Sequence, residues 1–422
     1  MTDVRPFRAL RYDPERVALS DVLAPVYDVV APEDRALFWD RHPYNALRLE
    51  LTRDVREEAQ TDYHEVAERL RRWRSEGVLR RDEEPGFYVL RQRFIAPDGR
   101  KLERVGFFGS LRLEDYAARV VRPHERTLAG PKADRLKLLR ATRTNLSSVF
   151  LLYEDRDAKL ASVLGQALEG PGALVATDDA GVEQTLVPLR EGASIEEIRG
   201  FLAERPVVIA DGHHRYETAL RYRDERRAAG APADAPSSRL LAYFANAFAP
   251  GSLLLPIHRL IVRGARPGPA EWARLRDSGW SCREIDAPAA EAIPALLERE
   301  LAPLADGYAF AADDASGRLA IWWRPAGEEL SIRVIHHEVL GGVCGLDDEA
   351  VRAGAVAFPK SALQTARDLR AGRGQLALYL NPLSPDDVFR VTERGETLPQ
   401  KSTFFYPKLP TGLLFRALEP DA

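Results

Sequence analysis

The stretch that most restricts how this chain can fold is VVIADGHHRYETAL, residues 207–220. It opens after Pro206 with a short, largely β-branched apolar run, which predicts a buried strand. A polar turn follows, and the pattern beyond it predicts a helix. Strand, turn and helix therefore succeed one another within fourteen residues.

The turn itself brings five polar or permissive residues together. Asp211 is a good N-cap, and Gly212 lets the backbone approach a ligand closely. The first turn of the helix offers unpaired N–H groups and the positive end of the helix dipole, and His213, His214 and Arg215 add side-chain donors. This combination predicts a phosphate site. The alternative is a capping aspartate, a packed histidine and a solvated arginine.

Composition sets outer limits on the class of protein. The chain has 422 residues, which predicts two or three domains, and a net charge of -4, which gives no global attraction to nucleic acid or anionic lipid. Cys282 and Cys344 are far apart and lack metal-ligand spacing. We expect a cytoplasmic protein with no membrane span, no resident metal and no nucleic-acid partner. The sequence leaves the oligomeric state open.

Helical and β-type patterns alternate along the whole chain. Residues 58–79 and 131–145 predict helices, the second with a basic stripe, and residues 86–95 and 101–113 predict a hairpin. A further hairpin is predicted at 307–326. The fold class is therefore α+β (mixed α/β). We predict an N-terminal α+β region (1–110), a central region carrying the motifs (111–262) and a C-terminal α+β region (263–422).

A second polar cluster lies in VRPHERTLAGPKADR, residues 121–135. If this loop faces the first motif, Glu125 is a candidate general base and His124 a donor to a transferring phosphoryl group. Arg126 and Lys132 would add positive charge for phosphates. An exposed polar loop is the equally balanced alternative.

A third cluster, QKSTFFYPKLPTG, begins at residue 400. Lys401, Ser402, Thr403 and Lys408 could close a site over the substrate, and a packed C-terminal strand explains the same pattern nearly as well.

Two smaller signals are candidates for lining a pocket. They are Tyr27 with Asp28 in APVYDVV and His258 with Arg259 in LLLPIHRLIV. We assign a structural role to His336 and His337, which lie in the apolar VIHHEVLGG. The chain lacks the P-loop, HExxH, GxSxG and GxGxxG signatures.

These motifs together resemble the bacterial and archaeal family filed as domain of unknown function 1015. The resemblance spans nearly the whole length and rests on APVYDVV, RPHERTLAGPKADRLKLL, VVIADGHHRYETAL, LLLPIHRLIV and PQKSTFFYPKLPTG. Two departures stand out, Val26 where the family commonly has a proline and Ile257 where it has a threonine.

The DGHHR turn is similar to the Gly-His-Arg turn of the ParB and sulfiredoxin superfamily. That resemblance implies a ParB/sulfiredoxin-like core that binds nucleotide phosphates through Gly212, His213, His214 and Arg215. It also implies ATP or ADP with Mg²⁺ as cofactor. Serine or phosphoserine is the metabolite that the resemblance suggests.

The leading hypothesis is a nucleotide-binding enzyme of phosphoryl transfer, kinase-like, that acts on a small polar metabolite. Glu125 is the expected base, with Asp211 in reserve. Two alternatives stay open: a nucleotide-responsive regulatory protein without turnover, and a metal-dependent phosphohydrolase.

Overall fold

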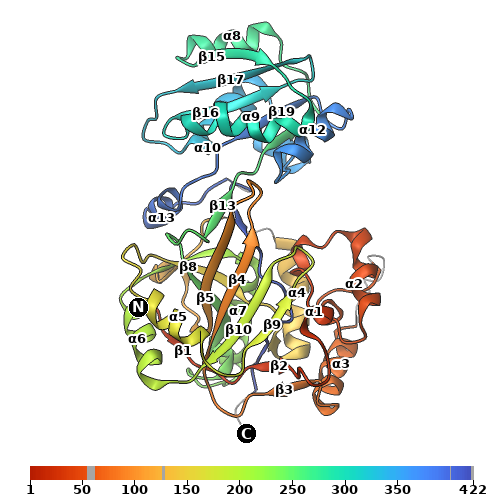
Figure 1. Cartoon of the computed structure of the whole chain (residues 1–422), viewed down its shortest axis with the longest axis vertical. Coiled ribbons are helices and arrows are strands. Elements are labelled where there is room, and N and C mark those ends of the chain that lie inside the picture. Colours follow the sequence, from red (N-terminus) through yellow and green to blue (C-terminus); the bar gives the residue numbers. More distant parts are fainter. Residues whose placement is uncertain (55–61, 126–128, 400, 420–422) are drawn as a thin grey trace. The chain divides into compact units, whose positions relative to one another are not determined.

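The computed structural model describes residues 1–54, 62–125, 129–399 and 401–419 (Figure 1). The chain forms two compact units. Unit 1 comprises Met1–Leu253, Thr392–Gly395 and Pro407–Ala422, and unit 2 comprises Leu254–Val391 and Glu396–Tyr406. The predicted boundary at residue 110 falls inside a strand of unit 1, and the one at residue 262 falls inside unit 2.

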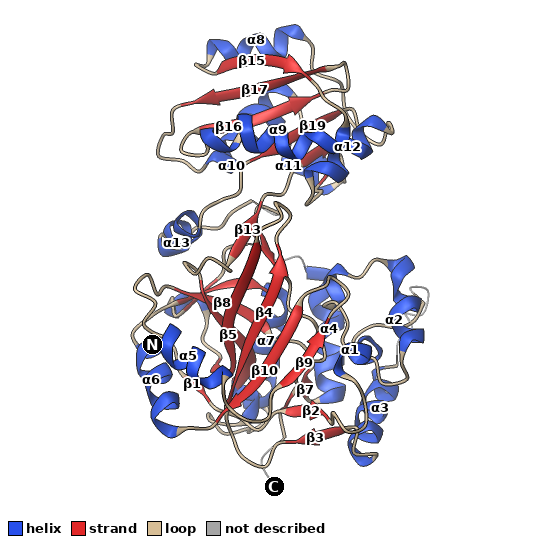
Figure 2. Cartoon of the chain, in the orientation of Figure 1, coloured by secondary structure: helices blue, strands red, loops and turns tan. Residues whose placement is uncertain are grey.

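Unit 1 is built on one mixed sheet of nine strands (Figure 2). Eight of them follow the order β6-β11-β8-β12-β5-β4-β10-β9, and β1 pairs with β5 beside this path. The strands are β1 (Val4–Arg5), β4 (Phe87–Ile95), β5 (Lys101–Arg112), β6 (Val121–Arg122), β8 (Val149–Tyr153), β9 (Leu174–Thr177), β10 (Glu183–Leu189), β11 (Val207–Asp211) and β12 (Arg239–Asn246).

The hairpin predicted from residues 86–113 forms the centre of this sheet. β4 and β5 pair antiparallel from Tyr88↔Phe108 to Ile95↔Lys101, around the turn at Asp98 and Gly99. Gly99 has φ 86°, a conformation that glycine adopts readily. The hairpin prediction is therefore confirmed.

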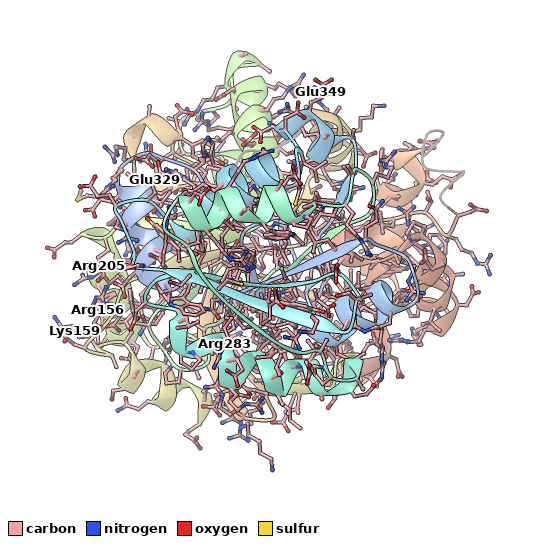
Figure 3. All side chains as sticks on the ribbon, turned by 90° about the horizontal axis from the view of Figure 1, so that it is seen from above. Arg156, Lys159, Arg205, Arg283, Glu329 and Glu349 are labelled. Atoms are coloured by element: carbon pink, nitrogen blue, oxygen red, sulfur yellow. The ribbon has the colours of Figure 1, made fainter. Side chains whose placement is uncertain are left out.

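Helices α5, α6 and α7 bury their apolar stripes against one face of the sheet. Leu164 of α5, Ile198 of α6 and Tyr216 of α7 belong to one buried cluster with Phe107 and Val207 of the strands. The helices of unit 1 are α1 (Leu19–Val22), α2 (Arg35–Arg41), α3 (Tyr63–Ser75), α4 (Ala129–Thr142), α5 (Ala161–Leu168), α6 (Gly192–Ala203) and α7 (His213–Ala228). Charged side chains such as Arg156 and Lys159 point outward (Figure 3).

The two predicted helices of unit 1 are present with shorter or shifted bounds. The first is α3, which begins at Tyr63 after its N-cap Asp62, whose carboxylate accepts from His64 N–H; residues 55–61 lie outside the described part of the chain. The second is α4, which packs on α7 through Leu136, Leu139 and Tyr222. Short 3₁₀ helices include η1 (Tyr27–Val29), which carries one of the smaller predicted signals.

The last residues of the chain complete unit 1. β21 (Arg416–Ala417) pairs with β7 (Thr144–Asn145), and Phe415 exchanges backbone hydrogen bonds with Leu10 of β2 (Leu10–Tyr12), which itself pairs with β3 (Leu79–Arg81). Pro407 O accepts a hydrogen bond of 2.6 Å from the buried Arg104. The terminal segment is thus part of the core of unit 1.

Unit 2 has a six-stranded sheet in the order β15-β17-β16-β19-β14-β18. Helices α9 and α12 pack on one face, where Ile293, Leu297, Ile321, Leu369 and Tyr379 form a buried cluster. The predicted hairpin at 307–326 is confirmed as β16 paired with β17. The strands are β14 (Arg259–Ile261), β15 (Ser281–Asp286), β16 (Tyr308–Asp313), β17 (Arg318–Arg324), β18 (Val356–Ala357), β19 (Leu376–Leu380) and β20 (Phe404–Tyr406).

The helices of unit 2 include one uncommon element. It is the π-helix η9 (Ile335–Val343), which contains His336 and His337. The other helices are α8 (Pro269–Asp277), α9 (Ile293–Glu300), α10 (Ser331–Val334), α11 (Asp348–Arg352) and α12 (Ala362–Arg370), while β13 (Leu253–Leu255) and α13 (Pro385–Glu393) lie where the chain passes between the units. The mixed α/β class is confirmed, and among the described residues no helix combines the length and apolarity needed to cross a bilayer.

Candidate functional site

The predicted strand, turn and helix form the candidate site in unit 1. β11 ends at Asp211, Gly212 takes φ 90° and ψ 30°, and α7 begins at His213. The N-cap is Gly212, which has no side chain to cap the helix, so the prediction that Asp211 is the N-cap is wrong. Tyr216 N–H donates to Gly212 O, and the N-terminal end of α7, where the helix dipole is positive, lies at residues 213–215.

Asp211 does not cap the helix because two cations bind its carboxylate. Arg215 Nη2 donates to Oδ2 at 2.6 Å, and Lys408 Nζ donates to Oδ1. Burial would raise the pKa of Asp211, but Lys408 and Arg215 outweigh it and hold that pKa far below its usual range. Asp211, Arg215 and Lys408 together carry one net positive charge, which the Asp28 carboxylate, 3.9 Å from Arg215 Nη2, offsets. This terminus and its cations form a site suited to an anion.

Contacts on several sides hold Arg215 in place. Its Nη1 donates to the carbonyl oxygen of Ser148, its Nη2 lies 3.9 Å from Asp28 Oδ2, and its Cζ lies 6.0 Å from the ring centroid of Tyr27. Burial lowers the pKa of Arg215, and the opposing carboxylates, Asp211 first, raise it above the ordinary value. The structure thus brings Tyr27 and Asp28 to the DGHHR turn, although the sequence separates them by almost two hundred residues.

The loop of residues 123–125, Pro-His-Glu (the PHE loop), lies against the same turn. His124 N–H donates to His213 Nε2 at 3.3 Å, and the two rings meet edge to face with centroids 4.6 Å apart. His124 Nδ1 bonds to the carbonyl oxygen of Ile209, so it is the donor of that bond. Burial lowers the pKa of both histidines. Both rings are therefore neutral, buried side chains that join the loop to the turn.

This arrangement changes the roles expected of the two histidines. His213 was predicted to hold phosphate through its ring, but its Nε2 already accepts the His124 amide and its side chain is buried. His124 was predicted to donate to a phosphoryl group, but its Nδ1–H is used by Ile209 and its Nε2 faces Glu125 Oε1 at 4.0 Å. The backbone amide of His213 remains at the helix terminus.

The remaining residues of the two motifs are distributed around the turn. Glu125 is partly exposed, with 23% of its side chain accessible. Lys132 of α4 forms an ion pair with Glu217 of α7. His214 lies at the second position of α7 and is partly buried. Arg126 lies outside the described residues.

Five other predicted site residues belong to unit 2. His258 is buried and its Nδ1 accepts from Leu380 N–H at 3.2 Å. Arg259 is fully buried and its Nε donates to His336 Nε2 at 3.0 Å, which gives His336 a structural contact. The hydroxyl of Ser402 donates to Pro399 O at 2.6 Å. Lys401 takes φ 58°.

The fifth, Thr403, is a partly buried residue next to β20. The terminal motif thus divides, because Lys401, Ser402 and Thr403 belong to unit 2 while Lys408 belongs to unit 1.

Sequence reasoning missed one carboxylate near Arg215. Glu50 follows η3 (Ala46–Leu49) and is only 3% exposed. Its backbone oxygen accepts from Arg135 Nη1 at 3.0 Å, and its Oε1 accepts from Thr411 Oγ1 at 3.3 Å. In the sequence it stands in the apolar run NALRLEL, where a lone acid was the available signal.

The described residues contain no group of three or more His, Cys, Asp and Glu side chains arranged to hold a metal ion. The donor set at the turn consists instead of amides, Arg215 and Lys408, which suit phosphate oxygens.

Comparison with solved structures gives similarities of low TM-score. A conserved hypothetical protein from Pyrococcus furiosus has 15% identity and a TM-score of 0.35, with 72% of this chain and 93% of that one covered. A free serine kinase in complex with AMP has 16% identity and a TM-score of 0.35, with 73% and 92% covered.

The third structure is SbnI with a C-terminal truncation, from Staphylococcus aureus. It has 11% identity and a TM-score of 0.35, with 75% of this chain and 90% of that one covered. Similarity at this level carries no argument about activity.

No curated protein matches the chain. One family model, however, matches residues 4–274, more than half of the sequence and the whole stretch from the first strand through the DGHHR turn. The chain therefore belongs to the protein family of unknown function DUF1015.

Proposed function

We propose that the protein binds ATP or ADP at the β11–α7 turn and transfers a phosphoryl group to or from a small polar metabolite. The observation that carries this proposal is the N-terminus of α7, whose N-cap is Gly212 and which Arg215 and Lys408 flank. Backbone amides, the helix dipole and two cations all favour phosphate oxygens at this position. A ParB/sulfiredoxin-like core around the turn is part of the same proposal.

Phosphoryl transfer requires positioning and neutralisation of charge more than covalent chemistry by the protein. In this proposal Arg215 and Lys408 shift part of their bonding from Asp211 to the phosphates, and Asp211 keeps both cations oriented. Asp211 is a poor base because the two cations lower its pKa. The partly exposed Glu125, held beside the turn by His124, remains the proposed base. Mg²⁺ would arrive with the nucleotide, and serine or phosphoserine is the first metabolite to try.

Calorimetric titration with ATP, ADP and CTP, with and without Mg²⁺, tests the phosphate site. Arg215→Ala should weaken nucleotide binding by roughly 10- to 100-fold, because it removes a charged donor. Arg221→Ala is the matched control, since Arg221 lies on the same helix with 63% of its side chain exposed. Equal affinity of Arg215→Ala and wild type, with both proteins folded, would contradict the proposal.

A turnover assay separates an enzyme from a binding protein that uses the same turn. Glu125→Gln should retain nucleotide affinity and lose phosphoryl transfer to the metabolite. Nucleotide binding by the wild type without transfer to any metabolite tested would favour the regulatory alternative.

A further inference from the structure

A small cavity lies beside Arg215 and is not accounted for by the phosphate site. Its volume is about 50 Å³, and it lies among η1, α4, α7 and the start of β12. One side is apolar and the other polar. The apolar wall includes Leu138, Leu139, Leu146 and Leu240, and the polar wall includes Tyr27, Glu50, Ser147, Arg215 and Thr218.

Three buried polar atoms of this lining have no hydrogen-bond partner among the described residues. They are Glu50 Oε2, Arg215 Nε and Thr218 Oγ1. Glu50 is 3% exposed and Thr218 is 4% exposed. Buried polar groups are nearly always hydrogen-bonded, because one left unpaired in the protein interior destabilises the fold. Three such atoms around one cavity indicate that a polar group occupies it.

The chemistry of the three atoms restricts that group. Glu50 Oε2 requires a donor, Arg215 Nε–H requires an acceptor, and a hydroxyl of Thr218 can do either. A second carboxylate would face Glu50, and an ammonium would face two guanidinium groups, Arg135 and Arg215. A hydroxyl donates and accepts at once without charge. The volume matches such a group, since one water needs roughly 10–15 Å³.

We propose that this cavity is a subsite for a hydroxyl group of the ligand whose phosphates bind at the β11–α7 turn. Glu50 accepts the hydroxyl hydrogen and Arg215 Nε donates to the hydroxyl oxygen. The hydroxyl could belong either to the ribose of the nucleotide or to the metabolite. The inference rests on the proposed function, and it adds Glu50 and Thr218 to the ligand-binding residues.

The surroundings of Glu50 suit this role. Burial raises its pKa, while Arg135, Arg215 and a hydrogen bond from the Ser147 side chain counteract that rise. The Thr411 hydroxyl donates to Oε1 at 3.3 Å, and Oε2 meets the hydrogen-bond criteria with none of the described residues. The carboxylate is thus held rigidly at the wall of the cavity, and its binding geometry exists before the ligand arrives.

Paired ligands that differ by one hydroxyl provide the test. ADP is compared with 2′-deoxy-ADP and 3′-deoxy-ADP, and L-serine with L-alanine in the presence of ADP and Mg²⁺, by calorimetry. In the wild type, loss of the bound hydroxyl should weaken affinity about tenfold or more, because a hydrogen bond to a charged group is lost. In Glu50→Gln this difference should shrink to less than about threefold.

A second variant and a control keep the result interpretable. Thr218→Val preserves the shape of the side chain and should also reduce the difference in affinity between the paired ligands. This variant provides the test if Glu50→Gln fails to fold. Glu225→Gln, on the partly exposed outer side of α7, should leave it at the wild-type value. A difference confined to the ADP pairs identifies the ribose, and one confined to the serine–alanine pair identifies the metabolite.

The outcomes separate the two proposals. If ADP binds the wild type but neither pair shows a Glu50-dependent difference, the cavity holds water only and the subsite is refuted while the nucleotide site stands. If no nucleotide binds the wild type, the proposed function fails and the subsite fails with it.

Discussion

Gly212 is the residue whose backbone makes the turn possible. Its φ of 90° lies in the left-handed region, and a Cβ at this position would come within 2.9 Å of Arg215 Nε and 3.0 Å of Arg215 Cζ. A side chain would therefore strain the backbone and push the guanidinium away from Asp211 at the same time. The glycine serves both the helix start and the placement of the arginine.

Gly212→Ala should accordingly affect both stability and binding. The left-handed conformation costs a non-glycine residue roughly 1–2 kcal/mol, and displacement of Arg215 should weaken ADP binding by about tenfold. Thermal unfolding and calorimetric titration measure the two effects. Gly165→Ala is the control, because Gly165 lies in α5 with nothing within 4 Å of the added Cβ. That variant should be neutral or up to about 1 kcal/mol more stable; similar losses in both variants would contradict the argument.

At the scale of elements, the sequence predicts the local structures and misses the partners that come from far along the chain. The apolar run and the glycine predict β11, the turn and α7, and the hairpin of β4 and β5 follows from its alternating strands and tight turn. The prediction that Asp211 caps α7 is wrong because its counter-ion Lys408 lies 197 residues further along the chain, where local sequence pattern does not reach. The contact of His213 with His124, 89 residues away, is missed for the same reason.

The contact between the PHE loop and α7 gives a prediction at this scale. His213→Phe keeps an aromatic ring of similar size but removes the acceptor for the His124 amide. The unpaired buried N–H should cost about 1–3 kcal/mol, and Glu125 should lose its fixed position. We expect nucleotide affinity to change little and any phosphoryl transfer to fall by tenfold or more. His213→Asn, which can supply an acceptor, should recover part of the activity, and an unaltered rate in His213→Phe would contradict this role.

For the whole molecule, buried histidines make stability depend on pH in both units. Burial lowers the pKa of His124 and His213 in unit 1, and burial with the nearby Arg259 lowers the pKa of His258 and His336 in unit 2 to about 3. The folded state thus binds fewer protons than the unfolded state, whose histidines titrate near 6.5. Stability is complete above that value and is lost as the pH falls below it.

His258 offers the cleanest measurement of this effect. Between pH 8 and pH 5.5 its loss of folding free energy should be about 1.4 kcal/mol, because the unfolded imidazole takes up a proton and the folded one does not. His258→Asn retains an acceptor for Leu380 N–H. In urea unfolding, the free energy of unfolding of this variant should therefore fall by about 1.4 kcal/mol less than that of the wild type between pH 8 and pH 5.5. Identical pH profiles for wild type and His258→Asn would refute this account.

The order in which the ribosome delivers the chain has a consequence for the candidate site. Unit 1 begins with residue 1 and is completed only by Pro407 and the residues after it, including Lys408 on Asp211, Thr411 on Glu50 and β21. Unit 2 lies between these two parts in the chain. During synthesis, most strands of the large sheet are therefore made before Lys408 and Thr411, and the contacts of these two residues with Asp211 and Glu50 form only after unit 2 has been made.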